Sequence, residues 1–210
     1  MSKIAAIFDV DHTLVQGPTE KLFFYYLLRR RQLSWSKALA FLGQVVLQPQ
    51  SRFYNKSYLA GKSIDEIEPL ARSCYQEMIA PRLSAQGREC VRQHQAQGHA
   101  IVILTGSLHC LICPLKEELG AQWLIATRLK RTNDHFNGQI AGSHPRGDNK
   151  LHLLRRLAQS EDFDISQSYA YADHIQDVPL LLKVGHPVVV NPNWRLKRLA
   201  QHYHWPIRYF

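Results

Sequence analysis

The sequence predicts an α/β fold: a doubly wound parallel sheet with an inserted α-helical cap. From residue 99 onward, short apolar runs alternate with helical segments, as in parallel sheets that helices cover on both faces. Between residues 19 and about 96 the pattern is helical, and this block directly follows the first apolar run. A chain of 210 residues that is 45% hydrophobic can fill such a core. We therefore expect a core domain of residues 1–15 and 84–210, with residues 16–83 as the cap.

The first part of the chain is predicted to contain one strand followed by helices. Residues 3–8 form a mostly apolar run that is typical of a buried parallel strand, and Gly17 and Pro18 interrupt the pattern after it. The next helix has Thr19 as its expected N-cap and ends in the basic triplet 29–31, as the helix dipole favours. The helices expected in this block cover residues 19–31, 35–47, 63–83 and 85–98, with breaks at Pro69 and Pro81.

The second part is predicted to alternate between strand and helix. Pro114 suits the first turn of a helix, so we expect that helix to begin near Cys113 and to end at Gly120. The dipeptide Asn137-Gly138 between extended residues is typical of a hairpin turn, and Gly185 is expected to cap a short helix. The predicted strands cover residues 100–104, 123–127, 168–173 and 187–191, and the remaining helices cover residues 149–159, 177–185 and 193–205.

Polar residues follow three of the predicted strands. Asp9 and Asp11 follow the first, Thr105-Gly106-Ser107 follows the second, and Asp173 and Asp177 follow the strand at 168–173. Ligands of open α/β sheets bind beyond the carboxyl ends of the strands, so these residues should meet at one edge. Asp177 also suits the N-cap of the next helix, and Thr105 suits an ordinary turn. Their convergence from distant parts of the chain favours a functional site.

The residue types at this edge indicate a chemistry. The carboxylates of Asp9, Asp11 and Asp173 are the hard donors that Mg²⁺ prefers, and a cation would offset their repulsion. Lys150 lies in the first turn of an expected helix, where a cation opposes the dipole at a cost of a few tenths to about 1 kcal/mol. A bound anion explains such a lysine. Together with the Thr105-Gly106 segment, these groups suit phosphoryl transfer through an aspartyl-phosphate.

These residues occur in the order of four known motifs. Asp9-Val10-Asp11-His12-Thr13 matches the pattern DxDxT, Thr105 closes the apolar strand of the second motif, Lys150 matches the third, and Asp173 with Asp177 matches DxxxD. The chain therefore resembles the haloacid dehalogenase superfamily of phosphatases, and within it the phosphoserine-phosphatase-like subfamily IB. The resemblance spans nearly the whole chain.

The resemblance implies a role for each matched residue. Asp9 would attack phosphorus, and Asp11 would protonate the leaving alcohol and then activate water. Thr105, the Gly106 amide and Lys150 would bind the phosphate. Residues 16–83 would form the family's helical cap, which closes over the substrate.

The resemblance also implies a Mg²⁺ site. Asp9, Asp173 and the backbone carbonyl of Asp11 would bind the ion. Asp177 would support Lys150 or a metal-bound water, and Thr13 would order the first loop.

The substrate is expected to be a small phosphorylated metabolite that resembles phosphoserine or histidinol phosphate. His174 and Gln176 depart from the residues usual in phosphoserine phosphatases, and Glu20 falls slightly late for the glutamate that reads the substrate amine. A lipid-phosphate phosphatase at a membrane surface is one alternative, because the apolar stretch 38–47 lies near the basic triplet 29–31. A non-enzymatic module that binds an anionic partner such as RNA is another. The acidic motifs and the lack of an aromatic-basic motif argue against it.

Composition limits the partners. The net charge of +9 favours anionic partners, although we expect no nucleic acid and interpret the triplet 29–31 as a solvated helix end. No apolar stretch is long enough to span a bilayer, which leaves peripheral contact open, and the absence of a secretory signal predicts a cytoplasmic protein. Cys110 and Cys113 form a CxxC pair, which we interpret as small apolar residues near a helix start because no second pair completes a zinc site. The oligomeric state stays open.

Overall fold

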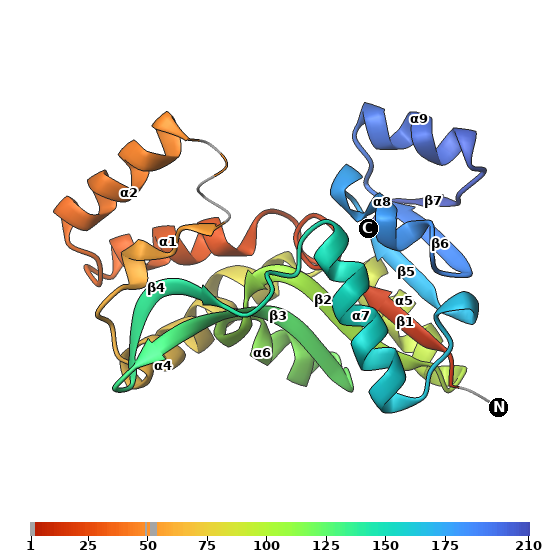
Figure 1. Ribbon diagram of the computed structural model, residues 1–210, viewed down its shortest axis with the longest axis horizontal. Coiled ribbons are helices and arrows are strands. Elements are labelled where there is room, and N and C mark those ends of the chain that lie inside the picture. The colour runs from red at the N-terminus through yellow and green to blue at the C-terminus, as the bar shows by residue number, and fades with distance from the viewer. Residues whose placement is uncertain (1–2, 49, 51–53) are drawn as a thin grey trace.

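The computed structural model describes residues 3–48, 50 and 54–210. Residues 1–2, 49 and 51–53, which the predicted domain ranges include, lie outside the described residues. A twisted seven-stranded sheet with the order β4-β3-β2-β1-β5-β6-β7 forms the centre of the molecule (Figure 1). All neighbouring strands are parallel except β3 and β4. The strands are β1 (Ala5–Phe8), β2 (Ala100–Leu108), β3 (Trp123–Thr132), β4 (His135–Ala141), β5 (Tyr169–Ala172), β6 (His186–Val190) and β7 (Ile207–Arg208).

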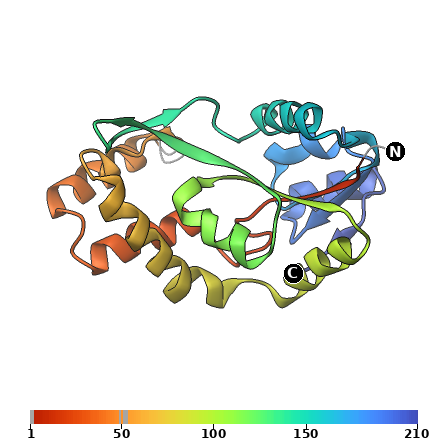
Figure 2. The same ribbon diagram turned by 90° about the horizontal axis from the view of Figure 1, so that it is seen from below.

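Helices cover both faces of the sheet, as Figure 2 shows from below. On one face, side chains of β1 and β2 such as Phe8 and Ile103 pack with buried residues of α1, α4, α5 and α6. On the other face, Ile7 and Val102 pack with residues of α7, α8 and α9. This arrangement confirms the predicted α/β fold. The helices are α1 (Thr19–Arg29), α2 (Trp35–Leu47), α4 (Ile64–Cys74), α5 (Ala85–Ala96), α6 (His109–Glu118), α7 (Asp148–Glu161), α8 (Val178–Leu181) and α9 (Trp194–His202).

The helical block between β1 and β2 is joined to the sheet at two places. Where the chain leaves and re-enters the sheet, Val15 pairs with Leu83 in an antiparallel bridge. At the far end, the β3–β4 hairpin pairs with the segment around the short helical turn η1 (Ser57–Leu59): Ser63 bridges His135, and the Phe136 amide donates to the Lys62 carbonyl. The described part of the block contains no strand of its own, as predicted. The boundaries of a separate cap domain stay a prediction.

The hairpin turn lies four residues before its predicted position. Asn133 and Asp134 form the turn with positive φ angles of 47° and 60°, and Thr132 pairs with His135 across it. The prediction of a turn at Asn137-Gly138 was wrong, because this dipeptide lies inside β4. Gly138 has a φ of 80°, and a Cβ there would lie 3.0 Å from Cα of Ser57. The glycine therefore serves close packing of β4 on η1.

Three helix predictions need correction. Pro69 lies inside α4 instead of breaking it, and α6 begins at His109, four residues before the predicted start, with Pro114 in its interior. Thr19 is the first residue of α1, whose N-cap is Pro18, and it makes no cap hydrogen bond there. Packing of α4 on α6 and α1, and of α6 on β2 and β3, outweighs the local cost of the two prolines.

Gly185 was predicted as a helix cap, but instead it lets two backbone segments pack closely. Its φ is not positive, and a Cβ would lie 1.9 Å from the carbonyl oxygen of Ser166. The Gly185 amide donates to the Ile165 carbonyl, so two backbone segments touch where any side chain would separate them.

Candidate active site

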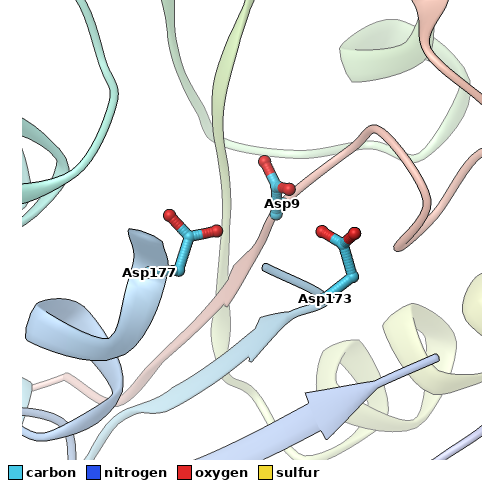
Figure 3. Close-up of side chains that lie close together, drawn as sticks. All are labelled: Asp9, Asp173 and Asp177. Carbon is cyan, nitrogen blue, oxygen red and sulfur yellow. The ribbon is translucent and has the colours of Figure 1, made fainter. Parts of the chain in front are cut away.

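Three aspartates meet at the carboxyl edge of the sheet, where the strand order reverses direction around β1. Asp9 follows β1, and its amide donates to the Tyr171 carbonyl on β5 at 3.0 Å, which fixes the chain at that point. Asp173 follows β5, and Asp177 ends the helical turn η5 (Ile175–Asp177) just before α8. Figure 3 shows their carboxylates turned toward one space. Ligand oxygens of the three side chains lie within 4.8 Å of one another.

Lys150 bridges two of these carboxylates. It lies in the first turn of α7, as predicted, and is 4% exposed. Its Nζ donates to Asp9 Oδ1 at 2.8 Å and to Asp177 Oδ2 at 2.9 Å. A buried lysine with two carboxylate partners can hold its charge beside a phosphate without a water shell.

The cluster is more negative than its lysine can balance. Burial raises the pKa of Asp173 to about 8, and the charges of Asp9 and Asp177 act in the same direction. Burial also raises the pKa of Asp177, although Lys150 opposes this shift. Burial alone would lower the pKa of Lys150, but Asp177 and Asp9 together raise it above its usual value. One ammonium thus faces three carboxylates.

This donor set fits a divalent cation. Carboxylate oxygens are the ligands that Mg²⁺ prefers, and a second cation would complete the charge balance. Asp9, Asp173 and Asp177 are the side chains that would bind it. The Asp11 side chain lies outside the cluster, and the expected role of its backbone carbonyl stays a prediction.

Asp11 is held by the hydroxyl groups of Thr19 and Ser107, and the sequence did not indicate these contacts. Thr19 donates its amide and its hydroxyl to Asp11 Oδ1 at 2.9 and 2.7 Å, and Ser107 Oγ contacts Oδ2 at 2.9 Å. The hydroxyls of Thr19 and Ser107 also contact each other at 2.7 Å. Burial raises the pKa of Asp11, while the bonds from Thr19 oppose this shift. A carboxyl with a raised pKa suits a proton donor.

The second motif continues as strand beyond its predicted end. Thr105 is 1% exposed, and its Oγ1 accepts from the amide of Ser107. The Gly106 carbonyl accepts from Thr127 Oγ1, which also contacts Nδ1 of His144 at 2.7 Å. These contacts fix the end of β2 where the Thr105 hydroxyl and the Gly106 amide are expected to meet phosphate. The Thr13 hydroxyl is buried without a partner among the described residues, so its ordering role stays a prediction.

A cavity of about 660 Å³ opens above the cluster. Asp9, Thr105 and Lys150 line its polar end. Its opposite wall comes from the helical block and is mostly apolar, formed by Phe24, Phe41, Leu42, Val45 and Tyr58. A phosphate ester placed here would have its phosphate at the polar end and its alcohol part against the apolar wall.

Glu20 is the carboxylate that the helical block contributes to this cavity. It pairs with Lys56, which is fully buried, at 2.6 Å, and it accepts from the Tyr58 hydroxyl at 3.1 Å. Arg146 also lines the cavity and directly precedes Gly147, the N-cap of α7.

Comparison with known proteins identifies the class. Residues 6–182 match the family model of haloacid dehalogenase-like hydrolases, and the chain belongs to this family. It is a phosphatase of the phosphoserine-phosphatase-like kind. It is 31% identical to phosphoserine phosphatase SerB1 of Mycobacterium tuberculosis over 217 residues, which cover 98% of this chain and 70% of that protein.

Two further relatives cover nearly the whole chain. A histidinol-phosphatase of Neisseria meningitidis is 26% identical over 99% of both proteins. The crystal structure of a protein of unknown function from Bordetella pertussis matches with a TM-score of 0.88 at 24% identity, covering 99% of this chain and 98% of that one. This last likeness concerns the fold.

Proposed function

We propose that this protein hydrolyses phosphomonoesters with Asp9 as nucleophile and with Mg²⁺ as cofactor. The observation that carries the proposal is the buried Lys150 between Asp9 and Asp177, beside a third carboxylate at the edge of the sheet. Bound to Asp9, Asp173 and Asp177, Mg²⁺ would neutralise the carboxylates and polarise a phosphoryl oxygen.

The first step transfers the phosphoryl group to the enzyme. An oxygen of Asp9 forms a bond to phosphorus, the bond from phosphorus to the ester oxygen breaks, and Asp11 gives its proton to the leaving alcohol. Thr105, the Gly106 amide and Lys150 hold the phosphoryl oxygens as charge develops on them.

The second step releases phosphate. Asp11, now a carboxylate, takes a proton from water, whose oxygen attacks phosphorus. The bond between Asp9 and phosphorus then breaks. Both side chains return to their starting protonation states with the loss of one inorganic phosphate.

We infer that the alcohol part of the substrate carries an apolar or aromatic group. The apolar wall that contains Phe24, Phe41 and Tyr58 supports this inference, because it would leave a small polar ester with no partner. The Glu20 carboxylate also lines the cavity, where it would pair with an amine on the substrate. Histidinol phosphate combines both features, and a relative of the same length is a histidinol-phosphatase.

Hydrolysis of p-nitrophenyl phosphate with Mg²⁺ and with EDTA tests the chemistry. We expect turnover with Mg²⁺ and its loss with EDTA. If no phosphoester is hydrolysed with Mg²⁺, the proposed chemistry is wrong and the alternative of a binding module has to be tested.

A substrate panel with a matched pair of variants tests the selectivity. The panel holds phosphoserine, histidinol phosphate and a short-chain lysophosphatidic acid. Phe41→Ala should lower kcat/KM for the last two by about tenfold, because it removes buried contact area, and should leave phosphoserine unchanged. Leu39→Ala changes the same helix outside the cavity and should leave all three unchanged. An equal loss on all substrates would place selectivity elsewhere.

A further inference from the structure

The positive charge of this protein is concentrated in one segment. Residues 21–64 contain eight Lys and Arg residues and no Asp or Glu. The rest of the chain holds 18 Lys and Arg against 17 Asp and Glu. The net charge of +9 therefore resides almost entirely in α1, α2 and the segment that follows them.

Helix α2 within this segment exposes an apolar stripe. Trp35, Leu39, Leu42 and Val46, at spacings of four, three and four residues, lie on one side of the helix and are 74%, 66%, 44% and 79% exposed. A second stripe that includes the buried Phe41 packs inward. Figure 1 shows α2 at the end of the molecule opposite to α9. Trp35, Leu39 and Val46 thus project from the molecule, whereas Leu42, the least exposed member of the stripe, also lines the cavity beside Phe41 and Val45.

Two cations precede this stripe closely in the chain. Arg29 and Arg31, at the end of α1 and in the loop before α2, are exposed. Arg30 pairs with Glu77, but no carboxylate in the described part of the chain pairs with Arg29 or Arg31. The apolar stripe and these two guanidinium groups are the components of a surface that binds anionic lipid.

We propose that the α1–α2 end of the protein docks peripherally on an anionic lipid surface, with the outer stripe of α2 at the level of the head groups. Large exposed apolar patches mark interaction sites, and the acid-free, basic segment favours an anionic partner. A second copy of the chain would bring the same positive segments together in an isologous contact, where they repel. Nucleic acid would match the charge but would leave Leu39 and Val46 in water.

Docking of this kind needs no membrane span. No helix in the described ranges is both long enough and apolar enough to cross a bilayer. With 13 residues, α2 is about 20 Å long and suits an orientation in the plane of the interface.

Sedimentation with lipid vesicles tests the proposal on the full chain, and it needs no catalysis. We expect binding to vesicles of phosphatidylcholine with phosphatidylglycerol, weak binding to phosphatidylcholine alone, and a loss of binding at high salt. Arg29→Gln with Arg31→Gln should lower the partition coefficient about 30-fold. Leu39→Ser with Val46→Ser should lower it at least about tenfold.

Controls separate docking from general effects. Trp194→Ser with Tyr203→Ser removes two exposed rings from the other end of the molecule and should leave binding unchanged. Leu39 and Val46 do not line the cavity, so turnover of p-nitrophenyl phosphate shows that their variant is folded. Equal binding to both kinds of vesicle, or equal losses in the α2 and control variants, would overturn the proposal. So would the absence of binding, whether the protein then binds RNA or self-associates through α2.

Discussion

Asp11, Thr19 and Ser107 form a ring of oxygen atoms whose protons can be counted. The ring contains three contacts between oxygens, of 2.7, 2.7 and 2.9 Å. The two hydroxyl groups supply two protons, so a third proton on Asp11 is needed to make every contact a hydrogen bond. Burial raises the pKa of Asp11 and favours the same protonated form. We infer that Asp11 begins the reaction as an acid.

This ring predicts a pH effect for Ser107→Ala. The Ser107 hydroxyl donates to Asp11 Oδ2, and this bond is stronger when Asp11 is a charged carboxylate than when the ring is neutral. Ser107 therefore lowers the pKa of Asp11, and its removal raises that pKa. The free enzyme needs protonated Asp11, and kcat/KM falls as pH rises through its pKa. The basic limb of the pH profile should therefore move to higher pH in the variant. Ser160→Ala, an exposed control, should not move it. An unmoved basic limb in Ser107→Ala would argue against Asp11 as the acid.

A second prediction concerns the nucleophile. Asp9→Asn replaces the attacking carboxylate by an amide, so kcat for p-nitrophenyl phosphate should fall by at least about 10³-fold. Asp11→Asn should also reduce kcat strongly, because the amide cannot deliver the proton. Circular dichroism should show that both variants are folded. Substantial turnover by folded Asp9→Asn would assign the nucleophile to another group.

The sequence predicted those site residues whose positions follow from the predicted ends of strands and starts of helices. Asp9, Asp173 and Lys150 follow from the alternation of apolar strands and helices. Ser107 was expected at this edge with Thr105 and Gly106, but its contact with Asp11 was missed because β2 was expected to end at Leu104. In a longer strand, the residue two after Thr105 faces the same side. The Glu20–Lys56 pair joins residues 36 apart, and no local pattern indicates such a contact.

At the scale of elements, the β3–β4 hairpin shows what local patterns leave open. Asn133-Asp134 and Asn137-Gly138 both tolerate positive φ, so turn chemistry alone does not choose between them. The contact of β4 with η1 sets the register. Helix α6 was predicted too short for a related reason, because its burial on β2 and β3 overrides a proline in its interior.

The packing of β4 on η1 predicts a difference between two glycine variants. Gly138 and Gly142 have φ angles of 80° and 68°, so alanine at either costs about 1–2 kcal/mol of unfolding free energy. A Cβ at Gly138 also meets Ser57 Cα at 3.0 Å, whereas at Gly142 nothing lies within 4 Å. Gly138→Ala should therefore lose about 1 kcal/mol more in chemical denaturation. Equal losses of unfolding free energy in the two variants would mean that η1 shifts to accommodate the Cβ at no energetic cost.

For the whole molecule, the carboxylate cluster links metal binding to stability. Mg²⁺ that binds the folded state alone should stabilise it by about 2.7 kcal/mol at about 100 times Kd, which raises Tm by about 5–10 °C. Asp173→Asn should abolish this gain, because it removes a ligand. An undiminished gain in that variant would place the ion elsewhere.

The pH dependence of this gain follows from the pKa of Asp173. That pKa is raised to about 8 without metal, so the folded state holds the proton more tightly than the unfolded state. Without Mg²⁺, the contribution of Asp173 to stability is lost as pH rises from about 4 to about 8. Mg²⁺ needs the carboxylate form, so its stabilising effect should grow over the same range. Thermal unfolding with and without Mg²⁺ across this range measures both trends.

The whole fold was predictable in outline, because the alternation of apolar runs and helices determines a parallel sheet with covered faces. Strand β7 was missed, since two residues carry no period. The charge asymmetry of residues 21–64 was also missed, because the triplet 29–31 was interpreted alone. The cytoplasmic location stays a prediction.

The helical block is attached to the rest of the molecule at both of its ends. One attachment is the Val15–Leu83 bridge, and the other is the β3–β4 hairpin that pairs with residues 62–64. Because a block held at both ends cannot open by a hinge motion of the whole block, we expect a local entrance to the cavity. We expect displacement of α2 to open this entrance for substrate and product. Phe41, Leu42 and Val45 of α2 line the cavity. A lipid surface that held the outer stripe of α2 would therefore also control how often substrate enters the cavity.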